Sequence, residues 1–324
     1  MSTSLLKLGQ VLRGRSGRYI VTTKIQDTVW LAKTKLEETV VVKGVEGHPR
    51  VENERDVLKR FQDKTPYLRP LLDEIEDPTT PTIIVLKHLD EDLLAATKRK
   101  SLNRKELKSV SRCVLEALRT LHEDGYVHTD IKPDNVLVNY GDKDGKNDTR
   151  FSHIQLGDLG GAYPTSSKWA KSGTPVGAPM WRSPEMIMET PWNTATDIWS
   201  FGATLITLIY GGDFNLFDPT TVPYGHEEYN LEVLKQQFRY FGPWPGKYEE
   251  IASPETVRAI QYIMQEIPKS DTTPFRMITQ KEVCRKDNEF IQKIMMMDWR
   301  DRPTARELLV DDWFEDDREL ARVS

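Results

Sequence analysis

The stretch "HTDIKPDN" at residues 128–135 gathers side chains that are suited to chemistry on a phosphate group. Asp130 offers a carboxylate that can accept a proton, Lys132 a cation, and Asn135 an amide oxygen for a metal ion. Asp, Asn, Lys and Pro are also the residues of ordinary polar turns. The octet alone is therefore compatible with an exposed loop as well as with a reactive site.

Six further polar residues precede or follow the octet, each inside a short patterned segment. They are Lys43 in "VVVK", Glu54 in "NERDVLKRF", Asp158 in "GDLGG", Glu185 in "RSPE", Asp197 in "DIWSFG" and Arg302 in "RDRPTA". Lys43 closes an apolar run typical of a strand, and Glu54 belongs to the helical pattern that follows it. The presence of these segments in this order favours a reactive site at the octet over an exposed loop.

The first ninety or so residues predict a small antiparallel sheet that carries one helix. Short segments rich in Val, Ile, Thr and Trp indicate strands. They cover residues 18–25, 28–36, 38–45 and 81–89. Between the last two, residues 51–61 place four apolar side chains on one face of a helix.

After His88 the pattern changes to helices. Asn103 followed by Glu106 is a helix-start signature before the segment 107–125, whose apolar residues recur at helical spacing. The segment 194–210 is apolar on nearly every side, which predicts a helix in the middle of a domain.

Two strand-like segments, 135–140 and 151–158, flank "GDKDGKND" at 141–148, which predicts an exposed hairpin loop. We therefore expect an α+β fold in one domain of residues 1–324. Its strand-rich lobe would comprise residues 1–87 and its larger, mainly helical lobe residues 88–324.

The ordered set of motifs resembles the eukaryotic protein kinase family from about Tyr19 to Phe314. The resemblance implies a bilobal kinase fold, with ATP and Mg²⁺ as cofactors. It also implies transfer of the γ-phosphate of ATP to a protein substrate. "DIKPDN" is similar to the serine/threonine version of the catalytic loop, which implies that Ser or Thr accepts the phosphate.

The resemblance gives the octet and Asp158 roles in phosphoryl transfer. It implies that Asp130 is the catalytic base and that Lys132 neutralises the phosphate in flight. It implies that Asn135 and Asp158 hold Mg²⁺, a hard ion that prefers oxygen ligands. Because the transferred group is densely charged, such catalysis rests mostly on positioning and electrostatic neutralisation.

The resemblance also assigns charged residues to the phosphates of ATP. Lys43 matches the lysine that contacts the α- and β-phosphates, and Glu54 matches the glutamate that holds this lysine in place. Glu52 remains an alternative partner for Lys43. Without such a partner, a lysine at the end of a strand would extend into solvent.

Apolar residues match positions around the adenine base. Val29, Val41 and Leu137 match the residues that sandwich adenine, Leu86 matches the back of that pocket, and Leu89 is assigned to the same cofactor site. A purely packing role remains open for the first four, because Val and Leu are buried by default.

Three further matches imply structural roles. Asp197 would brace the backbone of the catalytic loop, although "TATD" also fits a helix capping box with Thr194 as the cap. Glu185 and Arg302 would form a buried ion pair.

The phosphate-covering loop departs from the family pattern. The family has a "GxGxxG" hairpin, whereas "KIQDTVWLAK" at 24–33 contains no glycine and predicts a short turn. Glycines there let backbone N–H groups approach the phosphates, so the departure puts nucleotide affinity in question. "GRSGRY" at 14–19 has two glycines, but it precedes the first predicted strand, far along the chain from Lys43.

Two single residues also depart from the family. Thr129 replaces the usual arginine that pairs with a phosphate on the activation loop, so we expect that residues 158–185 do not switch activity through that contact. Hydroxyl residues in this loop that could still be phosphorylated are Thr165, Ser166, Ser167, Ser172 and Thr174. Ala178 replaces a threonine whose hydroxyl binds the catalytic Asp and Lys, so we expect weaker positioning of Asp130 and Lys132.

Composition narrows the class of protein. The 324 residues are 38% hydrophobic and 29% charged, with a net charge of −5 and without the basic footprint of a nucleic-acid binder. The longest apolar run is too short to span a bilayer. Cys113 and Cys284 lack metal-ligand spacing, which favours a reducing compartment. We expect a cytosolic or nuclear protein without nucleic-acid or membrane partners.

Three functions remain open from the sequence. The first is an active serine/threonine protein kinase that uses ATP and Mg²⁺, and the complete set of charged motif residues favours it. The second is a pseudokinase scaffold or allosteric partner, which the glycine-free loop and Ala178 favour. The third is a small-molecule kinase, against which "DIKPDN", "SPE" and "DIWSFG" argue.

Overall fold

The strands at the start of the chain close into one antiparallel sheet. The computed structural model describes residues 5–77, 80–141 and 149–315. The sheet has the order β1, β2, β3, β4, β6, β5, and β1 also pairs with β5. These strands are β1 (Val11–Gly14), β2 (Arg18–Gln26), β3 (Val29–Lys33), β4 (Thr39–Gly44), β5 (Leu71–Asp77) and β6 (Ile83–Lys87). The four predicted strands are present, and β1 and β5 are additions to the prediction.

Alternating side chains along β4 give the sheet two apolar faces. Val42 packs with Trp30 and Val85 inside the closed sheet. Val41 points the other way and joins the core shared with the helices. Helix α1 (Arg50–Phe61) packs on that face with four apolar residues and Glu54 buried. A buried glutamate requires a cationic or hydrogen-bonding partner. The burial of Glu54 therefore indicates that such a partner lies beside α1.

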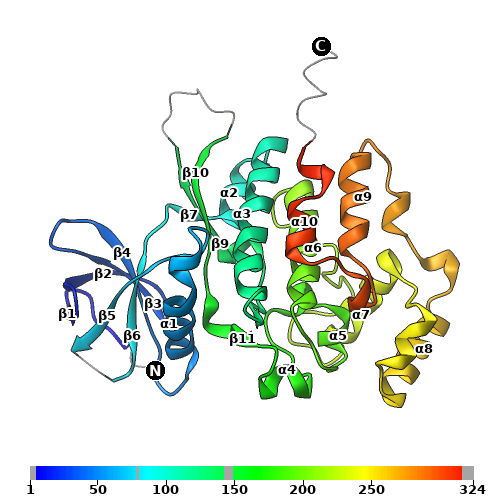
Figure 1. The fold of residues 1–324 in the computed structure, drawn as a ribbon, viewed down its shortest axis with the longest axis horizontal. Helices are drawn as coiled ribbons and strands as arrows, with labels where there is room; N and C mark the ends of the chain where they lie inside the picture. The colour runs from blue at the N-terminus through cyan, green and yellow to red at the C-terminus, as the bar shows by residue number, and fades with distance from the viewer. Residues whose placement is uncertain (1–4, 78–79, 142–148, 316–324) are drawn as a thin grey trace, which may run out of the picture.

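The rest of the chain is mainly helical and lies beside the sheet as a second lobe (Figure 1). Its helices are α2 (Leu93–Arg99), α3 (Arg104–His122), α4 (Lys168–Ser172), α5 (Pro184–Ile187), α6 (Ala195–Tyr210), α7 (Tyr229–Phe241), α8 (Pro254–Glu266), α9 (Arg285–Ile294) and α10 (Ala305–Leu309). This two-lobed arrangement confirms the predicted α+β fold class. No helix among the described residues is both long and apolar enough to cross a bilayer.

Short strands line the side of the helical lobe that faces the sheet. β7 (Glu91–Asp92), β9 (Val136–Tyr140) and β10 (Phe151–Leu156) form one small sheet, and β8 (Tyr126–Val127) pairs with β11 (Tyr163–Pro164). The pairing of β9 with β10 is the predicted hairpin. Residues 142–148 of the predicted hairpin loop lie outside the described residues.

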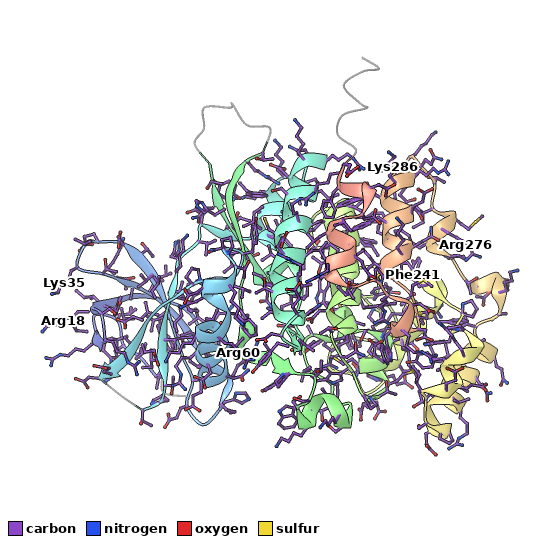
Figure 2. All side chains as sticks on the ribbon, viewed as in Figure 1. Arg18, Lys35, Arg60, Phe241, Arg276 and Lys286 are labelled. Atoms are coloured by element: carbon purple, nitrogen blue, oxygen red, sulfur yellow. The ribbon has the colours of Figure 1, made fainter. Side chains whose placement is uncertain are left out.

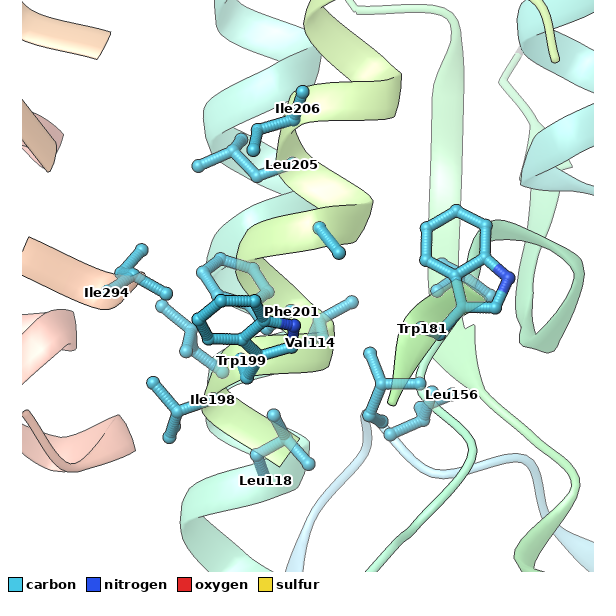
Figure 3. Close-up of a cluster of buried hydrophobic side chains, with 14 of the residues drawn as sticks. Val114, Leu118, Leu156, Trp181, Ile198, Trp199, Phe201, Leu205, Ile206 and Ile294 are labelled. Atoms are coloured by element: carbon cyan, nitrogen blue, oxygen red, sulfur yellow. The ribbon is translucent and has the colours of Figure 1, made fainter. Parts of the chain in front are cut away.

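Helix α6 forms the centre of the helical lobe, as its all-round apolar pattern predicts. Every residue from Thr196 to Leu208 is buried. In Figure 3, Trp199 and Phe201 of α6 lie in one cluster with Val114 of α3 and Ile294 of α9. Helix α3 begins with the predicted capping box of Asn103 and Glu106.

The predicted capping box of α6 is wrong. Thr194 is the N-cap residue, but its side chain makes no capping hydrogen bond. The carboxylate of Asp197 is used instead by the segment that follows α3, as described below.

Charged side chains such as Arg18 and Lys35 project from the surface, whereas Arg60 joins the lobes through its Nε, 2.8 Å from Asp124 Oδ2 (Figure 2).

The predicted buried ion pair is present between α5 and the segment before α10. Arg302 Nη1 and Nη2 lie 2.6 and 2.8 Å from the two carboxylate oxygens of Glu185. Both side chains are almost completely buried. Arg302 also donates to the carbonyls of Met296 and Ala195. The pair therefore ties three segments of the helical lobe together.

We expect Arg302→Met to lower the free energy of unfolding by roughly 3–5 kcal/mol, because it leaves Glu185 charged and buried without its partner. Arg306→Met is the matched control, since Arg306 pairs with Glu123 on the exposed surface, where such pairs contribute about 0–1 kcal/mol. Denaturant unfolding measures both. Equal effects of the two substitutions would contradict a structural role for the buried pair.

Candidate active site

A cavity of about 860 Å³ lies where the two lobes meet. Its volume falls in the range of small-molecule sites. Predicted site residues that line it are Val29, Val41, Lys43, Asp130, Lys132 and Asp158. Segments that are far apart in the sequence therefore converge on one cavity.

Three apolar residues predicted around the base do not line this cavity. Leu86 is 0% exposed and Leu89 is 6% exposed, so both are part of the packed interior. Leu137 packs beside Gly157, where a Cβ atom would lie 3.2 Å from its Cδ1. Arg69, for which the sequence predicted no role, lines the cavity. A packing role fits Leu86 and Leu89 better than a cofactor contact.

The carboxylate of Asp197 holds the backbone of the catalytic loop. It accepts hydrogen bonds from the backbone N–H of His128 at 2.7 Å and of Thr129 at 2.8 Å. His122 Nε2 lies 2.8 Å from the same carboxylate. Thr129 adopts a left-handed conformation with φ of 74°, which is uncommon for a threonine and needs such support. Asp197 is thus in the bracing position that the kinase resemblance implies.

Asp130 is held from three directions. Its Oδ2 accepts a hydrogen bond from Asn135 Nδ2 at 2.9 Å and lies 3.2 Å from Lys132 Nζ. Its Oδ1 accepts one from the backbone N–H of Ala178 at 3.2 Å. That N–H supplies a donor to Asp130 although Ala178 lacks the usual hydroxyl. Gly177 makes this approach possible, because a Cβ there would lie 2.2 Å from the Thr129 carbonyl oxygen.

Lys43 joins the sheet, helix α1 and Asp158. Its Nζ lies 2.6 Å from Glu54 Oε2 and 2.7 Å from Asp158 Oδ1. Burial opposes its charge, but the two carboxylates outweigh burial and raise the pKa of Lys43. The predicted pairing with Glu54 is present. The alternative partner, Glu52, accepts a hydrogen bond from Thr82 Oγ1 instead.

Arg50 is a cation of the site for which the sequence predicted no role. It begins α1, and its Nη2 lies 2.6 Å from Asp158 Oδ2 and 4.0 Å from Asp130 Oδ2. Burial would favour the neutral carboxyl, but Lys43 and Arg50 outweigh it and lower the pKa of Asp158 below its ordinary value. Gly160 leaves space for the Arg50 side chain, because a Cβ at Gly160 would lie 2.4 Å from Arg50 Cγ. An arginine in the first turn of a helix is unfavourable next to the positive end of the helix dipole. This unusual position was the feature of the sequence that could have indicated a role for Arg50.

Asn135 and Asp158 fit a role as ligands of Mg²⁺. Asn135 Nδ2 donates to the carbonyl and to the carboxylate of Asp130. Its Oδ1 accepts no hydrogen bond from the described residues. Those residues also form no group of three or more His, Cys, Asp or Glu side chains that could hold a metal ion. Mg²⁺ needs no such group when substrate phosphates complete its oxygen ligands.

The segment after Asp158 is anchored from both lobes. Thr129 Oγ1 donates to the Gly161 carbonyl at 2.7 Å. From α1, Asn53 Nδ2 donates to the carbonyls of Gly160 and Ala162 at 3.1 and 2.9 Å. Thr129, which cannot bind a phosphate as an arginine would, therefore holds this segment directly.

The turn above the cavity is short, as predicted. Only Asp27 and Thr28 separate β2 from β3. Of the two glycines of "GRSGRY", Gly14 ends β1 and Gly17 lies in the turn before β2, and the Gly14 N–H donates to the Gly17 carbonyl. The segment therefore follows the first strand, contrary to the prediction, and neither glycine lines the cavity.

This arrangement of lobes and site agrees with comparisons to known proteins. Residues 6–314 match the family described as protein kinase domain. The chain belongs to the protein kinase family. The match includes every predicted site residue and both lobes.

Relatives within the kinase family differ in how much of the chain they match. Calcium/calmodulin-dependent protein kinase type 1 of Macrobrachium nipponense is 29% identical over 233 residues, which is 70% of this chain and 61% of that protein. Serine/threonine-protein kinase cst-1 of Caenorhabditis briggsae is 38% identical over 120 residues, 37% of this chain and 22% of that protein. The chain thus spans less than two thirds of either relative.

A solved structure shows the same fold. The crystal structure of the yeast RNA Pol II CTD kinase CTDK-1 complex contains a chain that matches with a TM-score of 0.73. The match has 19% sequence identity and covers 92% of this chain and 93% of that one. At this identity the likeness concerns the fold alone.

Proposed function

We propose that the protein is a serine/threonine protein kinase that transfers the γ-phosphate of ATP to a protein substrate. The observation that carries the proposal is the convergence of Asp130, Lys132, Lys43 and Asp158 on one cavity. Membership of the kinase family and the names of its serine/threonine relatives support it further.

The reaction follows from the positions of these side chains. The substrate hydroxyl oxygen forms a bond to the γ-phosphorus, the bond to the β,γ-bridging oxygen breaks, and ADP leaves. Asp130 takes the hydroxyl proton, while Lys132 faces the transferred group. Lys43, held by Glu54, orients the α- and β-phosphates. Asn135 and Asp158 would hold Mg²⁺, which would supply positive charge to the phosphate oxygens.

A second candidate function is a kinase-fold scaffold that binds nucleotide weakly. The glycine-free turn between β2 and β3 favours it, because this turn offers few backbone N–H groups to the phosphates. The contact of Arg50 with Asp158 points the same way, since Mg²⁺ competes with this cation for the carboxylate. The set of acid, base and lysine residues at the cavity favours the enzyme.

We expect Asp130→Asn to lower phosphotransfer to Ser and Thr peptides about 10²–10⁴-fold, the usual contribution of a positioned general base. Nucleotide binding, followed by thermal shift with Mg·ATP, should persist, because the amide keeps the shape of the side chain. Asp124→Asn at the surface between the lobes is the control.

Three outcomes distinguish the functions. Loss of transfer with retained binding in Asp130→Asn supports the kinase. Binding without transfer by the wild-type protein supports the scaffold. No binding of wild type at millimolar ATP contradicts the enzyme.

We also propose that a phosphate on residues 158–185 does not govern activity, because Thr129 and Asn53 already anchor residues 160–162. Phosphatase treatment should then leave the rate of phosphotransfer unchanged. Thr129→Val, which removes one hydrogen bond worth about 0.5–1.5 kcal/mol, should lower it up to about tenfold. Ser166→Ala, at an exposed position of the same loop, should have no effect. A large loss of activity after phosphatase treatment would contradict this form of control.

A further inference from the structure

Arg69 is a cationic residue of the cavity wall that the proposed reaction does not use. Arg69 follows α1 in the chain, and its backbone N–H donates to the Leu156 carbonyl at 2.9 Å. Its side chain lines the cavity, and its Nε donates to the Lys87 carbonyl at 2.7 Å. Backbone and side chain are therefore both fixed.

Arg69 shares a neighbour with Leu137, which the kinase resemblance places beside the nucleotide base. A Cβ at Gly157 would lie 3.2 Å from Leu137 Cδ1 and 3.6 Å from Arg69 Cδ, so the two side chains share one neighbour. Lys87 is the last residue of β6, and the residue before it pairs with Val41 across the sheet. Arg69 thus lies near Val41, a cavity-lining residue that the kinase resemblance places beside the base.

The guanidinium of Arg69 has hydrogen-bond donors that no protein group accepts among the described residues. Within the described part of the chain, its two terminal nitrogens have no hydrogen-bond partner, and no carboxylate lies within 4.0 Å. Burial lowers the pKa of Arg69 to about 10, against the longer-range effect of Glu54 and Asp158. The side chain therefore stays charged at neutral pH. Arg69 is partly exposed at the cavity wall, and donors without a protein partner there favour a ligand that supplies acceptors.

We propose that Arg69 makes the base end of the cavity selective for purines with an oxygen at position 6, so that GTP binds at least as well as ATP. The proposal rests on the proposed nucleotide function of the cavity. Guanine presents its O6 and N7 as acceptors, the pair that arginine binds in bidentate fashion. Adenine presents an amino group at position 6, which would meet donors.

The Lys87 carbonyl holds the guanidinium in place for this contact. Its hydrogen bond with Arg69 Nε leaves the two terminal nitrogens as the donors for a base. A bidentate contact between arginine and the matching base discriminates against the wrong base by about 1–3 kcal/mol, which corresponds to roughly 5- to 150-fold in binding. The volume of about 860 Å³ leaves room for a nucleotide with Arg69 in place.

The test compares Mg·ATP, Mg·GTP and Mg·ITP binding to wild type and Arg69→Met by calorimetry. Met keeps an unbranched stem but removes every donor. ITP has the oxygen at position 6 and lacks the 2-amino group of guanine, so it isolates the contact in question. We expect Arg69→Met to shift the GTP-to-ATP affinity ratio about tenfold or more toward ATP, with ITP following GTP.

Two further variants keep the result interpretable. Arg69→Lys retains the charge with fewer donors and should give an intermediate ratio, even where Arg69→Met folds poorly. Arg55→Met, on α1 and away from the cavity wall, should leave the ratio unchanged.

The outcomes separate this inference from the proposed function. A wild-type protein that binds ATP about tenfold more tightly than GTP and ITP overturns the inference alone, as does an unchanged ratio in Arg69→Met. Binding of ATP by Arg69→Met but of no nucleotide by wild type shows that Arg69 blocks the base end, which also overturns it. Absence of nucleotide binding in every variant overturns the kinase function itself.

Discussion

The carboxylate of Asp158 lies between two cations from the other lobe, and the geometry of the site depends on this contact. Lys43 reaches it from β4 and Arg50 from the start of α1. Glu54 fixes Lys43, so that a strand, a helix and the segment after β10 are joined through one chain of charges. Because Lys43 and Glu54 are largely withdrawn from water, removing Lys43 would leave the buried carboxylate of Glu54 without its cation.

The helical lobe meets this cluster with a loop whose backbone is fixed from beneath. Helix α6 is buried along nearly its whole length, so Asp197 in its first turn has little freedom. Its hydrogen bonds hold Thr129 in a left-handed conformation and thereby turn Asp130 toward the cavity. Thr129 in turn anchors Gly161. Packing in the core thus determines where the carboxylate of Asp130 lies.

The sequence predicted those parts of the fold and site whose signals are local. The capping box of α3, the apolar α6 and the motif around Asp130 all follow from short-range patterns. β1 has only four residues, and β5 ("LLDEIED") is half acidic, so neither has the composition of a strand. The cap at Thr194 was mispredicted because Asp197 has tertiary partners that a local pattern does not contain.

Arg50 and Arg69 escaped prediction for a related reason. Arg50 and its partner Asp158 are 108 residues apart in the chain, and an isolated arginine is more often a surface residue. Only the fold brings Arg50 to Asp158 and Arg69 to the cavity. The hydrogen bond from the Ala178 N–H to Asp130 could not be predicted either, because every residue except proline has this donor and the residue type does not show where it is used.

The central claim is that these charges form a site for a nucleotide with its metal ion. Calorimetric titration of ATP into the protein, with Mg²⁺ and then with EDTA in its place, tests it most directly. The account predicts binding that depends on Mg²⁺ and that weakens markedly in Lys43→Met. Equal affinity with and without Mg²⁺, or no loss of affinity in Lys43→Met, would contradict it.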